Sequence, residues 1–474
     1  MNPLSLFWAP RAWLPQGWAE QVVLGIGADG TWAQVTPGVA QPPTGCTVLQ
    51  GSALPGLVDG HSHAFQRAFA GLAECREGGG DGAVDDFWSW RDRMYAVALR
   101  LTPAQLQAIA AQLYVELLRG GYTHVAEFHY LQHAQDGSAH SDPLAMSWAL
   151  ADAATEAGIG LTVLPVLYER AGFAQPLLRA DQRRFALGAD AAWAACERIN
   201  AAHRPNVDAG VALHSLRAAS PSAIHRLRAL TEGFSGAVHI HVAEQTQEVD
   251  DCLRATGARP VEWLAREGLL DARWQLVHAT HVTPAEIDAV AQAGAGVVLC
   301  PSTEANLGDG LTDLPAWLAA GEAAVPLSIG SDSNVTRGWR EELRLLEYGQ
   351  RLGLRRRNVS AGAEHGVPIA ATAERLWRRV LAGGAAAAGQ RLWGLQPGAR
   401  ADLLVVDTRD ASLLGVPATH LLDALVFTSP GRPWRDVMVA GRFVFSNHHH
   451  AASAAIAARF EAVMHELWSA PRGA

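Results

Sequence analysis

The chain has 474 residues, and its composition (49% hydrophobic, 18% charged) is typical of a soluble globular enzyme with a large core. All 38 basic residues are arginine, which excludes chemistry that needs a lysine: Schiff bases, pyridoxal phosphate attachment, P-loop nucleotide binding and a carboxylated lysine between two metal ions. The net charge is −9 and no basic run is present, so the sequence gives no support to a nucleic-acid or anionic-membrane partner.

The two ends of the chain predict short strands, and the part between them predicts a barrel. Residues 1–54 and 389–474 contain segments such as QVVLGI and DVMVAGRFVF, separated by turn-like proline and glycine. Eight short apolar strands alternate with alanine-rich helical stretches between them: 54–60, 122–128, 161–167, 209–215, 237–243, 275–281, 296–301 and 326–332. This pattern favours an α/β fold, a (β/α)8 TIM-like barrel over residues 55–388. The two ends are expected to pair into one small composite β-sandwich domain.

A long insert, residues 73–102, follows the first barrel strand. It contains a GGG run and the tryptophan-rich segment FWSW. Because such a segment would be unusual on an exposed surface, we expect the insert to be a loop at the catalytic mouth.

Cysteine usage and the lack of targeting segments favour a cytoplasmic location. The five cysteines are odd in number, scattered and without a CxxC pair, which fits a reducing compartment better than a disulfide framework. The start MNPLSLFWAPRAWLP lacks the features of a signal peptide. A membrane span is not expected either, because the sequence has no run of about 18 apolar residues.

Two HxH pairs lie in the predicted strands. His61 and His63 follow the first strand, and side chains two apart on a strand point the same way, so both imidazoles can enter the barrel. His239 and His241 form a second copy in the fifth strand. Alone the motif is weak evidence, because roughly one HxH is expected by chance with 19 histidines in 474 residues.

Further polar residues at strand ends strengthen the interpretation. Glu244 comes shortly after His241, His278 lies in the sixth strand, and Asp332 ends the eighth. Barrel enzymes place their active sites at the C-terminal ends of the strands. Three histidines and one aspartate make a plausible zinc set that leaves a position for water, whose pKa such a metal lowers to about 7.

Several segments between residues 55 and 334 resemble the amidohydrolase superfamily and, within it, the formimidoylglutamate deiminases of histidine degradation. They are PGLVDGHSHAFQRAFAG, FWSWRDRMY, AEFHYL, HIHVAEQTQEVDDC, LVHATH, CPSTEANLGDG and GSDSN. HSHAFQR together with FWSWR is the specific part, whereas HxH and the late aspartate indicate only the superfamily. The β-rich ends match the composite β-domain of that superfamily.

The resemblance implies one zinc ion per chain, and the ligands that it implies are His61, His63, His241 and Asp332. It makes Glu244 the proton shuttle and His278 the hydrogen-bonding partner of the attacking water or leaving group, with Asp332 as the third catalytic residue. The missing lysine agrees with one metal rather than two.

The resemblance also implies hydrolysis of N-formimino-L-glutamate to N-formyl-L-glutamate and ammonia, by a homodimer. The side chains interpreted as substrate contacts are Gln66, Arg91, Tyr130, His214 and Arg217. Two separate guanidiniums suit a dicarboxylate, because each can bind one carboxylate bidentately.

Other polar residues near these motifs are predicted to be structural. They are Arg67, His124, His239 and His281. For Glu127 and Glu304 the sequence does not separate a contact role from a role in loop architecture.

Two other functions remain open from the sequence. The first is a deaminase of the same superfamily that acts on a purine, pyrimidine or triazine ring, which the tryptophan-rich insert could stack. The second is a catalytically inactive barrel that serves as a binding protein, against which the complete set of ligand positions argues.

Overall fold

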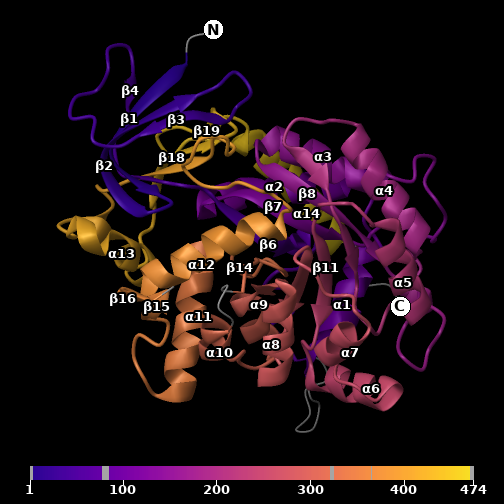
Figure 1. The fold of residues 1–474 in the computed structure, drawn as a ribbon. Coiled ribbons are helices and arrows are strands. Elements are labelled where there is room, and N and C mark those ends of the chain that lie inside the picture. The colour runs from indigo at the N-terminus through magenta and orange to yellow at the C-terminus, as the bar shows by residue number, and fades with distance from the viewer. Residues whose placement is uncertain (1–3, 77–84, 321–324, 365, 470–474) are drawn as a thin grey trace.

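A nearly closed parallel barrel forms the centre of the computed structural model, which describes residues 4–76, 85–320, 325–364 and 366–469 (Figure 1). The barrel strands are β6 (Leu57–Ser62), β7 (Tyr122–His129), β8 (Gly160–Leu167), β9 (Val207–Ala209), β10 (Val211–Leu213), β11 (Val238–Val242), β12 (Trp274–His278), β13 (Gly296–Leu299) and β14 (Leu327–Ile329). They pair in the order β6-β7-β8-β10-β11-β12-β13-β14, with β9 added beside β8. Asp332 N donates to His61 O at 2.9 Å and His63 N donates to Asp332 O at 3.0 Å, which closes the ring. The predicted barrel is confirmed.

Helices lie between the strands and cover the outside of the barrel (Figure 1). They are α2 (Pro103–Gly120), α3 (Ala145–Ala157), α4 (Ala189–Ala201), α5 (Pro221–Leu230), α6 (Thr246–Thr256), α7 (Pro260–Arg266), α8 (Pro284–Ala293), α9 (Pro301–Leu307), α10 (Leu314–Ala319), α11 (Trp339–Leu354) and α12 (Thr372–Ala387). The start of α2 illustrates how these helices begin. The Thr102 side chain accepts a hydrogen bond from Gln105 N, and Pro103 occupies the first helical position. No described helix combines the length and the apolar character that a membrane crossing requires.

Strands from both ends of the chain build one eight-stranded sheet beside the barrel. They are β1 (Ser5–Leu14), β2 (Gly17–Ile26), β3 (Trp32–Thr36), β4 (Thr47–Val48), β5 (Ala53–Leu54), β17 (Leu403–Val406), β18 (Trp434–Val439) and β19 (Arg442–Phe445). Leu54 of β5 pairs antiparallel with Leu404 of β17, and this pair joins the two halves. The prediction that both ends form one β-domain is confirmed. Smaller elements are the hairpin β15 (Gly362–Glu364) and β16 (Val367–Ile369), the helix α13 (Leu421–Phe427) and the 3-10 helices η1 (Ala64–Ala68), η2 (Ala180–Gln182), η3 (Ala411–Leu413) and η4 (Ala418–His420).

Three helices were not anticipated, and one of them is α13, which lies in the C-terminal segment that predicts short strands. The insert 73–102, predicted as a loop, contains α1 (Phe87–Ala98), which begins at a capping box between Asp86 and Ser89. Residues 77–84 of the insert lie outside the described residues. The helix α14 (Ser453–Ser469) packs against α2 of the barrel instead of the β-domain, and Trp468 Nε1 donates to Ala68 O at 3.1 Å.

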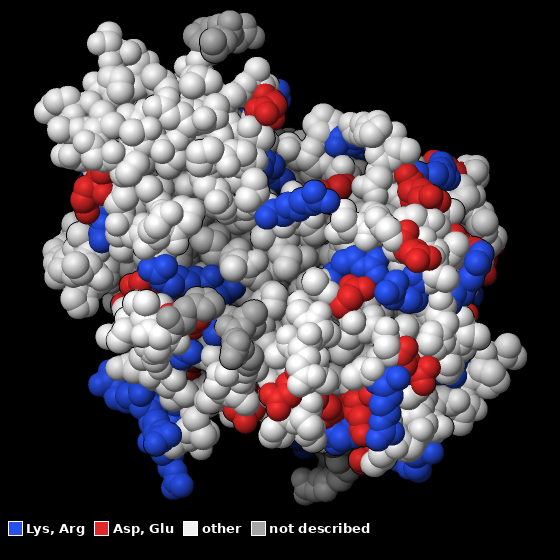
Figure 2. All heavy atoms as spheres, in the orientation of Figure 1, with Lys and Arg blue, Asp and Glu red and all other residues white. Residues whose placement is uncertain are grey.

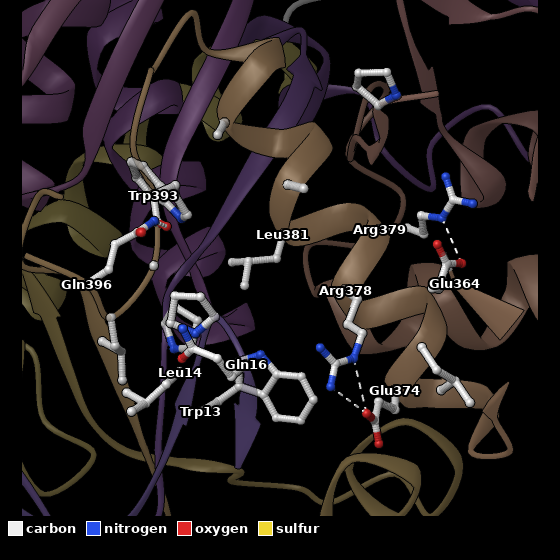
Figure 3. Close-up of a pocket in the computed structure, with 18 of the residues that line it drawn as sticks. Trp13, Leu14, Gln16, Glu364, Glu374, Arg378, Arg379, Leu381, Trp393 and Gln396 are labelled. Atoms are coloured by element: carbon white, nitrogen blue, oxygen red, sulfur yellow. Dashed lines mark hydrogen bonds and ion pairs between the residues drawn. The ribbon is translucent and has the colours of Figure 1, made fainter. Parts of the chain in front are cut away.

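A cavity between the β-domain and α12 lies at the N-terminal ends of the barrel strands (Figure 3). Its wall includes Pro55, which precedes β6, together with aromatic and aliphatic side chains. Arg378 pairs with Glu374 at 2.8 Å, and Arg379 pairs with Glu364 at 2.9 Å. Glu364 also pairs with Arg375 at 2.6 Å, so two arginines share this carboxylate.

Candidate active site

Four side chains from three strand ends meet at the C-terminal end of the barrel. His61 lies in β6 with His63 directly after it, His241 lies in β11 and Asp332 follows β14, and one ligand atom of each lies within 4.8 Å of the others. His61 Nε2 is 3.2 Å from His63 Nε2 and 3.0 Å from His241 Nε2. Asp332 Oδ1 is 3.5 Å from His61 Nε2 and 3.3 Å from His63 Nε2. The fold thus brings the four predicted metal ligands together.

The histidines present lone pairs to one another, as metal ligands do. His63 Nδ1 is 3.0 Å from Phe128 O and His241 Nδ1 is 3.1 Å from His214 O, so Nδ1 carries the proton in both rings and Nε2 is free to bind a metal. Burial lowers the pKa of His61 to about 3 and also lowers the pKa of His63 and of His241, which keeps the rings neutral. Ligands at about 2.0–2.1 Å from a tetrahedral zinc ion are about 3.3 Å apart, close to these separations. The donor set therefore fits a divalent cation.

Asp332 supplies the negative charge of this set. Burial alone would raise its pKa, but the contacts with His61, His278 and His63 hold the pKa of Asp332 well below its usual range. Neutral imidazoles and an ionised carboxylate are both kinds of ligand that zinc binds.

The backbone is strained where the strands that carry these groups end. Ala243, which follows β11, has a φ of 52°, His278 has a φ of 67° and Asp332 has a φ of 47°. Non-glycine residues rarely adopt this left-handed conformation, and those that do cluster at functional sites. His278 and Asp332 both line the pocket above the metal ligands.

His278 is surrounded by carboxylates. Its Nε2 is 3.7 Å from Glu244 Oε1 and 3.6 Å from Asp332 Oδ2, and its Nδ1 is 3.3 Å from Glu304 Oε1. Burial alone would lower the pKa of His278, but Glu244, Glu304 and Asp332 raise it well above its usual value. Burial raises the pKa of Glu244 to about 7, so this carboxyl can take up and release a proton near neutral pH.

The structure shows what Glu304 contacts, which the sequence left open, and it places Asp309 beside Glu244 and His278. Glu304 Oε1 also accepts from Cys300 N at 2.9 Å, so it orients the His278 ring. Asp309 lies with Glu244 and His278 in a buried cluster whose ligand atoms are within 4.8 Å of one another, and burial raises its pKa to about 9. The segment NLGDG contains Asp309, but no local signal distinguishes this residue from an exposed loop aspartate.

The predicted substrate contacts line the same small pocket. They are Gln66, Arg91, Tyr130, His214 and Arg217. Gln66, in η1, donates from Nε2 to the Tyr130 hydroxyl at 3.2 Å. Arg91 is carried by α1, so the insert does reach the site. The Trp88 ring centroid is 4.7 Å from Arg91 Cζ and 5.4 Å from Arg217 Cζ, so one indole packs against both guanidiniums.

Arg217 differs from most arginines of this chain in having no acidic partner. On the face shown in Figure 2, many basic side chains lie beside acidic ones. Arg91 Nη2 is 3.3 Å from Asp92 Oδ1, while its Nε is buried without a hydrogen-bond partner. Among the residues that the structure describes, Arg217 forms no ion pair, although it lines the pocket. The pocket thus contains a positive charge that no acidic side chain pairs with.

The four residues predicted to be structural do not line this pocket. Their hydrogen-bond partners are Glu116 for Arg67 (2.7 Å), Thr162 for His124 (2.8 Å), Ala387 O for His239 (2.7 Å) and Asp309 O for His281 (2.8 Å). Glu127 accepts from Ala64 N and so supports the turn after His63.

Comparison with protein families supports this geometry. Residues 52–444 match the model of the Amidohydrolase family. The chain belongs to the amidohydrolase family. Residues 4–44 of this amidohydrolase match the N-terminal domain of formimidoylglutamate deiminase HutF. It is 46% identical over 466 residues to the formimidoylglutamate deiminase of Pseudomonas aeruginosa, which covers 98% of this chain and 100% of that relative.

Solved structures share the fold of this amidohydrolase. An amidohydrolase from Brucella melitensis has a TM-score of 0.89 and 40% identity, covering 98% of this chain and 99% of the other. An adenosine deaminase from Xanthomonas campestris with bound zinc has a TM-score of 0.77 and 22% identity, covering 98% of both chains. The second likeness shows a shared fold alone.

Proposed function

We propose that this amidohydrolase is a zinc-dependent formimidoylglutamate deiminase, which hydrolyses N-formimino-L-glutamate to N-formyl-L-glutamate and ammonia in histidine degradation. One observation carries the proposal: a single pocket has a metal-ligand set at its base and two guanidiniums on its wall, one of them without an acidic partner. The identity of 46% to a formimidoylglutamate deiminase supports the same substrate.

The metal part of the proposal rests on the donor set. A zinc ion would be held by His61, His63, His241 and Asp332. When bound, zinc acts as a Lewis acid and makes a water molecule more acidic.

The residues around the base of the pocket are placed to move protons. Water adds to the amidine carbon, the bond from this carbon to the terminal nitrogen breaks, and this nitrogen leaves as ammonia. Glu244, with a pKa of about 7, can accept a proton from the water and return it to the leaving nitrogen. When the carbon–nitrogen bond breaks and the carbonyl forms, Asp332 takes the second proton from the adduct hydroxyl and relays it to the leaving nitrogen. His278, held by Glu304, donates a hydrogen bond to the water or the leaving group.

Arg91 and Arg217 are placed to bind the two carboxylates of the proposed substrate. A guanidinium can bind a carboxylate with two parallel hydrogen bonds. Arg217 forms no ion pair among the described residues, although Glu248 and Glu244 lie near enough to feel its charge, and Arg91 keeps a buried Nε without a partner. We assign one substrate carboxylate to each guanidinium.

The decisive experiment is ammonia release by purified, zinc-loaded protein. N-formimino-L-glutamate is expected to be turned over, whereas adenine and other aminopurines are not. The second candidate, a ring deaminase, is favoured by Phe87 and Trp90, which line the pocket and could stack a heterocycle. If the protein releases ammonia from an aminopurine and not from N-formimino-L-glutamate, it is a ring deaminase and not a formimidoylglutamate deiminase.

We also propose that the enzyme is a cytoplasmic homodimer. All five cysteines are free in the structure, which suits a reducing compartment. Sedimentation of the purified protein tests the dimer, and a monomer at working concentration would contradict it.

A further inference from the structure

Three of the four proposed metal ligands lie on the two sides of a seam in the barrel. His61 and His63 come from the end of β6, whereas Asp332 follows β14. Within the described chain these two strands share no regular ladder, and their pairing is an isolated bridge between Ser62 and Asp332. The strands approach closely there, since a Cβ on Gly330 would lie 2.7 Å from His61 O. Two backbone hydrogen bonds connect Asp332 to His61 and His63 there, and buried side chains add further connections across the seam.

Asn334 spans this seam. Its side chain is fully buried, and its Nδ2 donates to His63 O at 3.0 Å and to Asp332 O at 3.0 Å. Its backbone is left-handed, with a φ of 61°, a conformation that asparagine adopts more readily than most residues. One amide group thus binds the backbone of one metal ligand from each side.

A second buried connection runs from Asn334 back to β6. Ser331 Oγ is 2.9 Å from Asn334 Oδ1 and 2.6 Å from Asp59 Oδ2. Ser331 N donates to Asp59 Oδ1 at 2.9 Å, and His61 N donates to the same oxygen at 3.4 Å. Because all four residues are buried, water does not compete for these hydrogen bonds.

We propose that Asn334 is a positioning residue for the metal centre, which sets the spacing of the ligands by holding His63 and Asp332 together across the seam. The inference rests on the proposed metal centre. Asn334 does not line the substrate pocket, so its effect passes through the ligands alone. Groups that orient metal ligands typically change metal affinity by about 10- to 100-fold when they are removed.

The test compares two substitutions of the same kind. Asn334→Gly removes the amide and leaves a residue that adopts the left-handed backbone without strain. Asn206→Gly is the control for the backbone change alone, because Asn206 has a φ of 60° but is exposed and precedes β9 at the N-terminal end of the barrel. Each protein is loaded with zinc and mixed with excess chelating dye, and zinc release is followed together with circular dichroism, which reports unfolding.

We expect Asn334→Gly to release zinc about 10- to 100-fold faster than the wild type while it stays folded, and Asn206→Gly to release zinc at the wild-type rate. Ser331→Ala, which removes the hydroxyl contacts with Asn334 Oδ1 and Asp59 Oδ2 and keeps the bond from Ser331 N to Asp59, is expected to release zinc at an intermediate rate. If Asn334→Gly does not fold, the zinc-release rate of Ser331→Ala tests the positioning role instead.

Three results would overturn the proposal, and each has a different meaning. Wild-type release rates in Asn334→Gly, or in Ser331→Ala if the first variant does not fold, remove the positioning role. Equal acceleration in Asn334→Gly and Asn206→Gly assigns the effect to general loosening of the fold. A wild-type chain that binds no zinc removes the metal centre itself, and its measured metal content shows this before any variant is compared.

Discussion

The two ends of the barrel differ in how their buried charges are satisfied. At the N-terminal end, Arg400 is 2.9 Å from His124 Nδ1 and pairs with Asp402 at 2.6 Å. At the C-terminal end, Arg217 has no ion pair among the described residues, and burial raises the pKa of Glu244 and Asp309. Satisfied charges join the two domains at one end, whereas unsatisfied charges at the other end indicate where a ligand binds.

The largest effect is expected at Glu244. Glu244→Gln keeps the size of the side chain but removes the group that accepts and returns the proton, so kcat should fall about 100- to 10,000-fold. The zinc content should stay at the wild-type value, because Glu244 is not among the proposed ligands. Turnover at the wild-type rate would remove the shuttle role.

A smaller effect is expected at Arg217. Arg217→Met deletes a charged hydrogen-bond donor, and the loss of such a bond costs about 1.5–3 kcal/mol of binding free energy. The KM for N-formimino-L-glutamate should therefore rise about 10- to 100-fold. Arg226→Met is the control, because Arg226 pairs with Asp190 at 2.6 Å on the surface. An unchanged KM in Arg217→Met would show that the unpaired charge does not bind substrate.

At the opposite end, Arg400→Met should change stability without changing catalysis. It breaks the bonds to His124 and Asp402, so the free energy of unfolding should fall by about 1.5–3 kcal/mol in chemical denaturation. The kcat/KM of the folded protein should not change. A selective loss of activity would contradict the division of roles between the two ends.

The smallest effect is expected at Asp92, whose Oδ1 contacts Arg91 Nη2 at 3.3 Å and Arg179 Nη2 at 3.0 Å. This contact is half exposed, and exposed ion pairs contribute about 0.2–1 kcal/mol. Asp92→Asn should therefore change KM by at most about fivefold and leave kcat unchanged. A large fall in kcat would instead show that α1 orders the catalytic groups.

The parts of the fold and site that depend on local patterns could be predicted from the sequence. Apolar strands showed the barrel, and the rule that barrel active sites lie at strand C-termini placed His61, His241 and Asp332 together. The helix α1 was missed although Asp86 and Ser89 have the spacing of a capping box. The adjacent glycine run and the aromatic residues obscured that signal.

The remaining features depend on contacts between distant parts of the chain. Ser331 and Asp59, which bond across the seam, are 272 positions apart. Whether Asn334 or Asp309 faces solvent or the barrel interior depends on where other strands lie, which no local pattern encodes. A single sequence therefore predicted the candidate metal ligands but not the residues that hold them.

The composite sheet has a consequence for synthesis on the ribosome. Leu54 of β5 can pair with Leu404 of β17, its antiparallel partner, only after Leu404 has been synthesised. At about 5–20 residues per second, the roughly 350 residues between them take about 20–70 s to make. During this interval the edge of β5 has no partner strand, and an open edge of this kind can pair with another chain. This edge of the first strands therefore stays uncovered until nearly the last domain segment has emerged.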